Sequence, residues 1–180
     1  MNHDSYSDDY IRAILGGCKT IAMVGASANK IRPSYFAMAY LLEKGYRVIP
    51  INPGQAGKAI LGQTVYARLA DIPDPIDLVD IFRGSEAAGA VVDDVLSIKP
   101  LPAVVWMQLG VRNDQAAARA EAAGLRVVMN RCPKIEYGRL CGEIGWMGIN
   151  RKVISSRKLE LAEGRTQKLT IRPPRTHSPT

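Results

Sequence analysis

Short apolar runs alternate with segments of helical spacing from Thr20 to Ile135, and this alternation predicts repeated strand–helix–strand units. The apolar runs are rich in Val and Ile and nearly continuous, which is typical of strands covered on both faces in a parallel sheet. The predicted strands are residues 20–24, 46–51, 77–82, 103–106 and 126–129. The pattern therefore predicts an α/β fold with a doubly wound, open parallel sheet of about five strands. We expect the second and third strands to be parallel neighbours.

Helical spacing between these runs ends at Gly or Pro, two residues that commonly stop helices. The predicted helices are residues 35–44, 86–99 and 113–123, with two more at 6–15 and 133–140. In the predicted helix 86–99, one apolar face is expected to hold Ala87, Val91, Val95 and Ile98. The long segment 54–69 is predicted to cross the sheet edge, with a small extra strand near 59–61.

Charge divides the chain unevenly. Residues 1–149 carry 16 Lys and Arg against 15 Asp and Glu, whereas residues 150–180 carry 8 against 2. We therefore predict a folded domain at 1–141, a basic arm at 142–172 and a disordered tail at 173–180. A nearly neutral domain does not favour nucleic-acid binding. An arm that embraces a second subunit would make a homodimer.

Several kinds of chemistry are disfavoured by residue usage. No apolar run approaches the roughly 18 residues of a membrane span, and the acidic start is unlike a secretion leader, so we expect a cytoplasmic protein without a membrane partner. Cys18, Cys132 and Cys141 form no C-x-x-C pair, and His3 and His177 both lie beside a terminus. We therefore expect no disulfide framework, no metal site and no histidine-based catalytic site.

Small, amide and cationic residues follow every predicted strand, where ligands bind in open parallel sheets. These residues are Gly25-Ala26-Ser27, Asn52-Pro53-Gly54, Arg83-Gly84-Ser85, Gln108-Leu109-Gly110 and Asn130-Arg131-Cys132. After the first strand, Lys30 and Arg32 precede Ser34 at a predicted helix start, an arrangement that favours a phosphate-bearing ligand. Arg83 has two open interpretations: a ligand contact, or an ion pair with Asp77, Asp80 or Glu86.

Two common phosphate motifs do not match. The first turn is not G-x-G-x-x-G, and Asn52 stands where an NAD site would place an acidic residue for the ribose. A P-loop is absent as well, because the chain has no G-K-[ST] sequence. A nucleotide with an additional phosphate therefore fits better than NAD.

The sequence resembles the small stand-alone CoA-binding domain proteins, whose Rossmann-like fold is related to the CoA-binding domain of the succinyl-CoA synthetase alpha subunit. The resemblance spans residues 11–157 through IAMVGAS, RPSYFAMAYLLEKGYRVIPINPG, DLVDIFR, VVWMQLGV, VVMNRCPKIEYGRL and VISSR. It implies that CoA phosphates lie near Gly25, Ala26, Ser27, Lys30, Arg32 and Ser34. It also implies that Asn52 and Pro53 flank the adenosine, while Arg83, Gln108 and Gly110 border the remaining crevice.

The chain departs from the family at several positions. Gly84-Ser85 replaces a second arginine or a proline found in many members, and Tyr137 replaces a frequent histidine. The second domain and phosphohistidine of the synthetase have no counterpart here, so ligase activity is not implied. The predicted function is binding of CoA or an acyl-CoA, with no evident catalytic residues. The alternatives are an NAD(P)-dependent enzyme and a nucleic-acid-associated protein acting through its tail.

Overall fold

A computed structural model describes residues 2–142 of the chain. The predicted basic arm and tail lie outside these residues, apart from Gly142. The chain divides into two compact units, one of Met1–His3 with Cys18–Pro133 and one of Asp4–Gly17 with Lys134–Thr180. The first unit contains the sheet.

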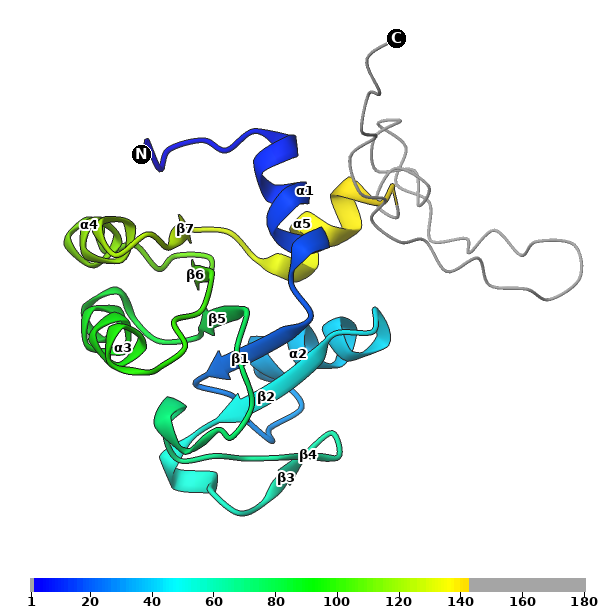
Figure 1. Cartoon of the computed structure of the whole chain (residues 1–180). Coiled ribbons are helices and arrows are strands. Elements are labelled where there is room, and N and C mark those ends of the chain that lie inside the picture. The colour runs from blue at the N-terminus through cyan, green and yellow to red at the C-terminus, as the bar shows by residue number, and fades with distance from the viewer. Residues whose placement is uncertain (1, 143–180) are drawn as a thin grey trace, which may run out of the picture. The chain divides into compact units, whose positions relative to one another are not determined.

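The sheet has five parallel strands in the order β2-β1-β5-β6-β7, which confirms the predicted α/β class (Figure 1). The strands are β1 (Thr20–Val24), β2 (Arg47–Ile51), β5 (Leu78–Ile81), β6 (Val104–Met107) and β7 (Arg126–Val128). The expectation that the second and third strands are neighbours is wrong, because β1 lies between β2 and β5 and pairs with both. The strand order runs from β1 to β2 on one side and from β1 through β5 to β7 on the other. The topological switch point therefore lies between β1 and β5.

Three helices cover this sheet within the first unit: α2 (Pro33–Glu43), α3 (Ser85–Ser97) and α4 (Asp114–Ala122). Figure 1 shows α3 and α4 on one side of the sheet and α2 on the other. The core between the sheet and the helices α3 and α4 contains Val79 and Ile81 of β5 packed with Ala88 and Val92 of α3. The predicted α3 face is confirmed at Val95, which is buried, and at Val91 and Ile98, which pack partly buried against the core. Ala87 is exposed, and the adjacent Ala88 and Val92 are buried instead.

A small antiparallel hairpin follows β2. Its strands are β3 (Ala59–Ile60), which is the predicted extra strand, and β4 (Gln63–Thr64). Two 3-10 turns flank it, η1 (Pro53–Gln55) and η2 (Leu69–Asp71). The backbone of Tyr66 exchanges hydrogen bonds with Pro50 and Asn52, so the segment after the hairpin lies along the edge of β2.

The second unit contains α1 (Asp8–Gly17) and α5 (Pro133–Leu140), whose first residue belongs to the sheet unit. An Arg12 guanidinium nitrogen donates to the carbonyl oxygen of Leu140 at 3.2 Å. Arg139 pairs with Asp8 at 2.8 Å and with Glu136 at 2.7 Å. These contacts hold the two helices together although more than a hundred residues separate them.

Candidate ligand site at the switch point

The turn after β1 requires a glycine at its first position. Gly25 has φ of +90°, a conformation that L side chains rarely adopt. A Cβ atom there would overlap the carbonyl oxygen of Phe82 at the end of β5. The Gly25 amide donates to the Ile51 carbonyl at 2.9 Å, and Ala26 is buried directly after it. The turn therefore closes against the ends of both neighbouring strands.

Local hydrogen bonds shape the loop between this turn and α2. Ser27 Oγ accepts from the Asn29 amide at 3.2 Å, and Asn29 Oδ1 accepts from the Ile31 amide at 3.1 Å. Lys30 and Arg32 are exposed on this loop. Arg32 is the N-cap residue of α2 and makes no side-chain capping bond, while Ser34 is buried in the first turn. The positive end of the α2 dipole therefore lies beside two cations.

Asn52 connects the end of β2 to the Gly25 turn. Its Nδ2 donates to the Ala26 carbonyl at 2.7 Å, and its Oδ1 accepts from the Gly54 amide at 3.0 Å. Gln55 adds a second link, because its Oε1 accepts from the Ala28 amide at 3.3 Å. Pro53 is exposed beside this connection. The residues that the sequence assigned to two separate loops thus form one assembly.

Arg83 extends from the end of β5 over the same turn. Its Nε lies 3.2 Å from the position that a Cβ of Gly25 would occupy. Within residues 2–142, no carboxylate lies within ion-pair distance of Lys30, Arg32 or Arg83. Arg83 therefore does not form any of the ion pairs considered from the sequence. Three cations without carboxylate partners lie on the loops that follow β1 and β5.

Gln108 turns away from this site and into the protein. It is 6% exposed, and its Nε2 donates to both carboxylate oxygens of Asp80, at 2.9 and 3.1 Å. Asp80 is fully buried, and this burial raises its pKa to about 7, although the Gln108 hydrogen bond acts in the opposite direction. From the sequence, Asp80 was considered only as a partner of Arg83, so its buried pair with Gln108 was missed.

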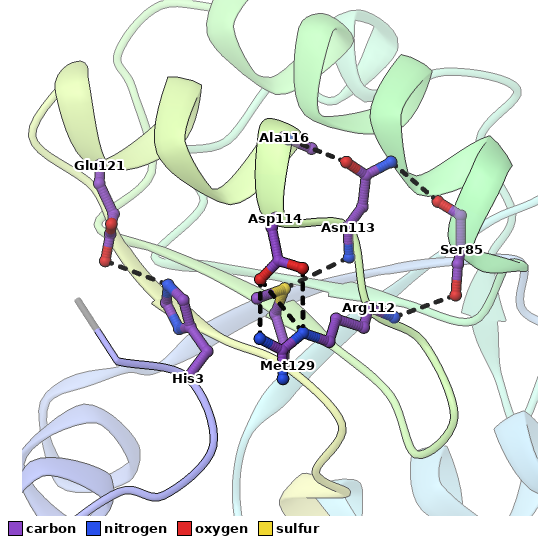
Figure 2. A network of polar contacts seen from close by, with 8 residues as sticks. All are labelled: His3, Ser85, Arg112, Asn113, Asp114, Ala116, Glu121 and Met129. Carbon is purple, nitrogen blue, oxygen red and sulfur yellow. Dashed lines mark hydrogen bonds and ion pairs between the residues drawn. The ribbon is translucent and has the colours of Figure 1, made fainter.

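Gly110 belongs to a hydrogen-bond network that joins the loops after β5, β6 and β7. Its amide donates to Asn130 Oδ1 at 2.8 Å, and its carbonyl accepts from Ser85 Oγ at 3.4 Å. Figure 2 shows the adjoining contacts: Ser85 Oγ accepts from the Arg112 amide at 3.0 Å, and Asn113 Nδ2 donates to the Ser85 carbonyl at 3.0 Å. These bonds fix the rim beside Arg83.

His3 is a further polar residue whose position the sequence did not indicate. It is buried, and its Nε2 lies 3.4 Å from Glu121 Oε1 of α4 (Figure 2). In the described part of the chain, no group of three or more His, Cys, Asp or Glu side chains is placed to hold a metal ion. The helices within the same residues are also too short or too polar to cross a membrane.

The parallel sheet and its topological switch point define an α/β domain of the Rossmann-like class. Residues 19–138 match the family described as CoA binding domain. The chain belongs to this family.

The chain is similar to proteins that it covers over nine tenths or more of their length. An uncharacterized protein of Bacillus subtilis (strain 168), YneT, is 33% identical over 127 residues, which are 71% of this chain and 91% of the relative. A hypothetical protein from Pyrococcus horikoshii OT3 has 39% identity and a TM-score of 0.72, covering 79% of this chain and 97% of that one. A Thermus thermophilus structure, cell-free ID.343, has 36% identity and a TM-score of 0.70, covering 74% of this chain and 98% of that one.

A larger protein contains the same fold. The dinucleotide forming acetyl-coenzyme A synthetase 1 of Ca. Korarchaeum cryptofilum is 26% identical with a TM-score of 0.53. The similarity covers 62% of this chain but only 26% of that enzyme.

Proposed function

We propose that this protein binds CoA or an acyl-CoA by its phosphates, at the carboxyl ends of β1 and β5. The observation that carries the proposal is that, within residues 2–142, Lys30 and Arg32 on the loop after Gly25 and Arg83 beside Gly25 have no carboxylate partner. CoA carries a diphosphate and a separate 3′-phosphate, so it offers anionic groups at two places. Family membership supports CoA over other phosphate-bearing ligands.

Each part of the site has a physical role in this proposal. Gly25 lets the turn close against the Phe82 carbonyl, because a side chain is absent there, and Arg83 Nε lies beside it. The Arg83 guanidinium can donate two parallel hydrogen bonds to a phosphate, and Lys30 and Arg32 add charge beside the start of α2. Ala26 and Ser34 are buried at the two ends of this loop, and Ser27 Oγ accepts from the Asn29 amide within it.

The rest of the ligand would follow the rim in both directions. The Asn52-Pro53 turn borders the proposed adenosine site next to β2. On the other side, Gly110 and the exposed Leu109 border the proposed path of the pantetheine and of any acyl group. We assign no catalytic step to these residues, so the proposed mechanism is recognition.

The test is a calorimetric titration of the ligand-free protein with CoA, dephospho-CoA and NAD. We expect CoA to bind most tightly and dephospho-CoA to bind more weakly, because it lacks the 3′-phosphate. Arg83→Ala and the double variant Lys30→Ala/Arg32→Ala should each weaken CoA binding by about tenfold or more, since each removes charge-assisted hydrogen bonds. The losses should shrink at high salt.

The matched control is Arg119→Ala, which removes a cation from α4 that is paired with Asp93 at 2.9 Å. It should bind CoA as the wild type does. Heat with NAD but not with CoA would contradict the proposed ligand. Unchanged CoA affinity in Arg83→Ala would contradict the proposed position of the phosphates.

A further inference from the structure

A carboxyl group is buried in the strand that supports the proposed site. Asp80 is the third residue of β5 and is fully buried. Its register partners on the neighbouring strands are Met23 of β1 and Trp106 of β6, neither of which carries a charge. Along β5, the nearest charged residues are Asp77 before the strand and Arg83 after it. The opposite face of β5 packs on α3 through Val79 and Ile81.

Gln108 is the hydrogen-bond donor that faces this carboxyl group. Its single amide nitrogen contacts both oxygens of Asp80. A buried ionised carboxylate usually needs several donors or a cation to offset its lost hydration. Burial therefore dominates, and the pKa of Asp80 rises to about 7. The proton occupancy of this group changes within the ordinary range of cellular pH.

The same glutamine is also the first residue of the rim loop after β6. The backbone amide of Gln108 donates to the Ile81 carbonyl at 3.3 Å, and the backbone carbonyl of Gln108 accepts from the Val111 amide at 2.9 Å. Leu109 and Gly110 lie between these two anchored points. Gln108 directly precedes these two residues, so a movement of its side chain affects the loop that borders the proposed ligand.

We propose that the protonation state of Asp80 sets the affinity of the rim for an anionic ligand through the charge of its carboxyl group, and that Gln108 transmits the same change to the rim loop. This inference rests on the proposed function. In the ionised state both carboxylate oxygens accept from Gln108 Nε2. In the neutral state the carboxyl O–H donates to Gln108 Oε1 after the amide rotates, while Nε2 donates to the other oxygen.

The sign of the effect follows from charge. An ionised Asp80 repels the phosphates of a ligand bound beside Arg83, so the neutral form binds the ligand better and ligand binding takes up protons. Arg83 follows Asp80 by three positions, so in extended backbone their Cα atoms are roughly 10 Å apart. With an effective dielectric constant near 20 this distance gives about a tenfold effect, which salt reduces to about fivefold.

The experiment measures dephospho-CoA binding between pH 6 and pH 8 in buffers that differ in ionisation enthalpy. Dephospho-CoA is the probe because it lacks the phosphate monoester, which itself titrates near pH 6. The wild type should lose about threefold in affinity over this range, because a group with a pKa of about 7 does not complete its titration between pH 6 and pH 8, and should take up a fraction of a proton on binding. Asp80→Asn should show neither effect. Gln108→Met should move the transition to higher pH, because the hydrogen bond that lowers the pKa of Asp80 is gone.

A second measurement needs no ligand. The backbone amide NMR signals of Leu109 and Gly110 should titrate with a midpoint near pH 7 in the wild type and remain constant in Asp80→Asn. Asp77→Asn removes a carboxylate from the other end of the same strand and should leave this titration in place.

The outcomes separate the inference from the proposed function. Loop signals that do not titrate, or that titrate equally in Asp80→Asn, overturn the inference whether or not a ligand binds. Binding with the same pH dependence in both proteins also overturns it and leaves the proposed function standing. Titrating loop signals without binding of CoA or dephospho-CoA at any pH overturn the proposed function, and the coupling to a ligand with it.

Discussion

The buried carboxyl of Asp80 predicts an unusual dependence of stability on pH. Its pKa is raised in the folded protein from 3.8 to about 7 by burial. Between these two values the folded chain holds a proton that the unfolded chain has released. The free energy of unfolding contributed by Asp80 is therefore fully present below pH 4 and is lost as the pH rises to 7. Above about pH 8 both states are ionised and the contribution stays constant.

The magnitude follows from the size of the shift. A change of about 3 units at 1.36 kcal/mol per unit corresponds to about 4 kcal/mol of stability lost between pH 4 and pH 7. Asp80→Asn cannot ionise, so its unfolding free energy should lack this decline. The hydrogen bonds of the new amide with Gln108 add an offset, which is the same at every pH. The difference between the two proteins should therefore change by about 4 kcal/mol in favour of the variant.

Urea denaturation measured at half-unit steps from pH 4 to pH 8 tests this prediction. Fluorescence and far-ultraviolet circular dichroism should give coincident transitions and a constant m value in each protein, so that the free energies can be compared. Asp77→Asn should retain the wild-type decline over the same range. Parallel curves for the wild type and Asp80→Asn would refute the reasoning, because an ionisable group with a raised pKa must produce a difference in slope.

Three further predictions concern the turn at the site, a buried thiol and a helix cap. Gly25→Ala should lower the free energy of unfolding by about 2 to 3 kcal/mol in chemical denaturation, because of its positive φ and the overlap with Phe82, whereas Gly17→Ala, with open space at the Cβ position, should not. Cys18, whose pKa burial raises to about 11, should react with iodoacetamide at pH 8 at least a hundredfold more slowly in the folded than in the urea-unfolded protein, as followed by mass spectrometry. Asn113→Ala should cost about 1 to 2 kcal/mol in thermal unfolding, because Asn113 Oδ1 caps α4 at 2.9 Å; an unchanged melting temperature would contradict that role.

The strands and helices could be predicted from the sequence because each apolar run ends at residues with strong turn preferences. Gly45 and Gly124 both adopt positive φ directly after the helices that they were expected to end. The strand order could not be predicted in the same way, since pairing β1 with β5 depends on contacts between distant segments. The buried face of α3 was also ambiguous, because two adjacent apolar stripes, through Ala87 and through Ala88, both fit helical spacing.

The candidate site was predictable in its loops but not in the direction of each side chain. Parallel strands bring their carboxyl ends to one edge, which is why Gly25, Asn52 and Arg83 were expected to lie together. Gln108 was grouped with them because an amide after a strand suits a ligand. Continuing the alternation of β6 past Trp106 places Gln108 on the face of Asp80, since Trp106 and Asp80 are register partners. The missed pair was therefore readable only once the register was known.

The cations at the end of β1 and β5 support the interpretation of the rim as a binding surface. Elsewhere in the described residues, several exposed arginines have a carboxylate partner: Arg47 with Asp74, Arg68 with Asp71, Arg112 with Asp114 and Arg119 with Asp93. Within residues 2–142 the cations at the switch point have none, and neither do Lys19, Lys58 and Lys99 elsewhere. Lys30, Arg32 and Arg83 differ from these in following two neighbouring strands at one edge of the sheet. Placing them together costs electrostatic energy in the ligand-free protein, and an incoming polyanion removes that cost. The energy released favours binding, as is expected for a site that holds phosphates.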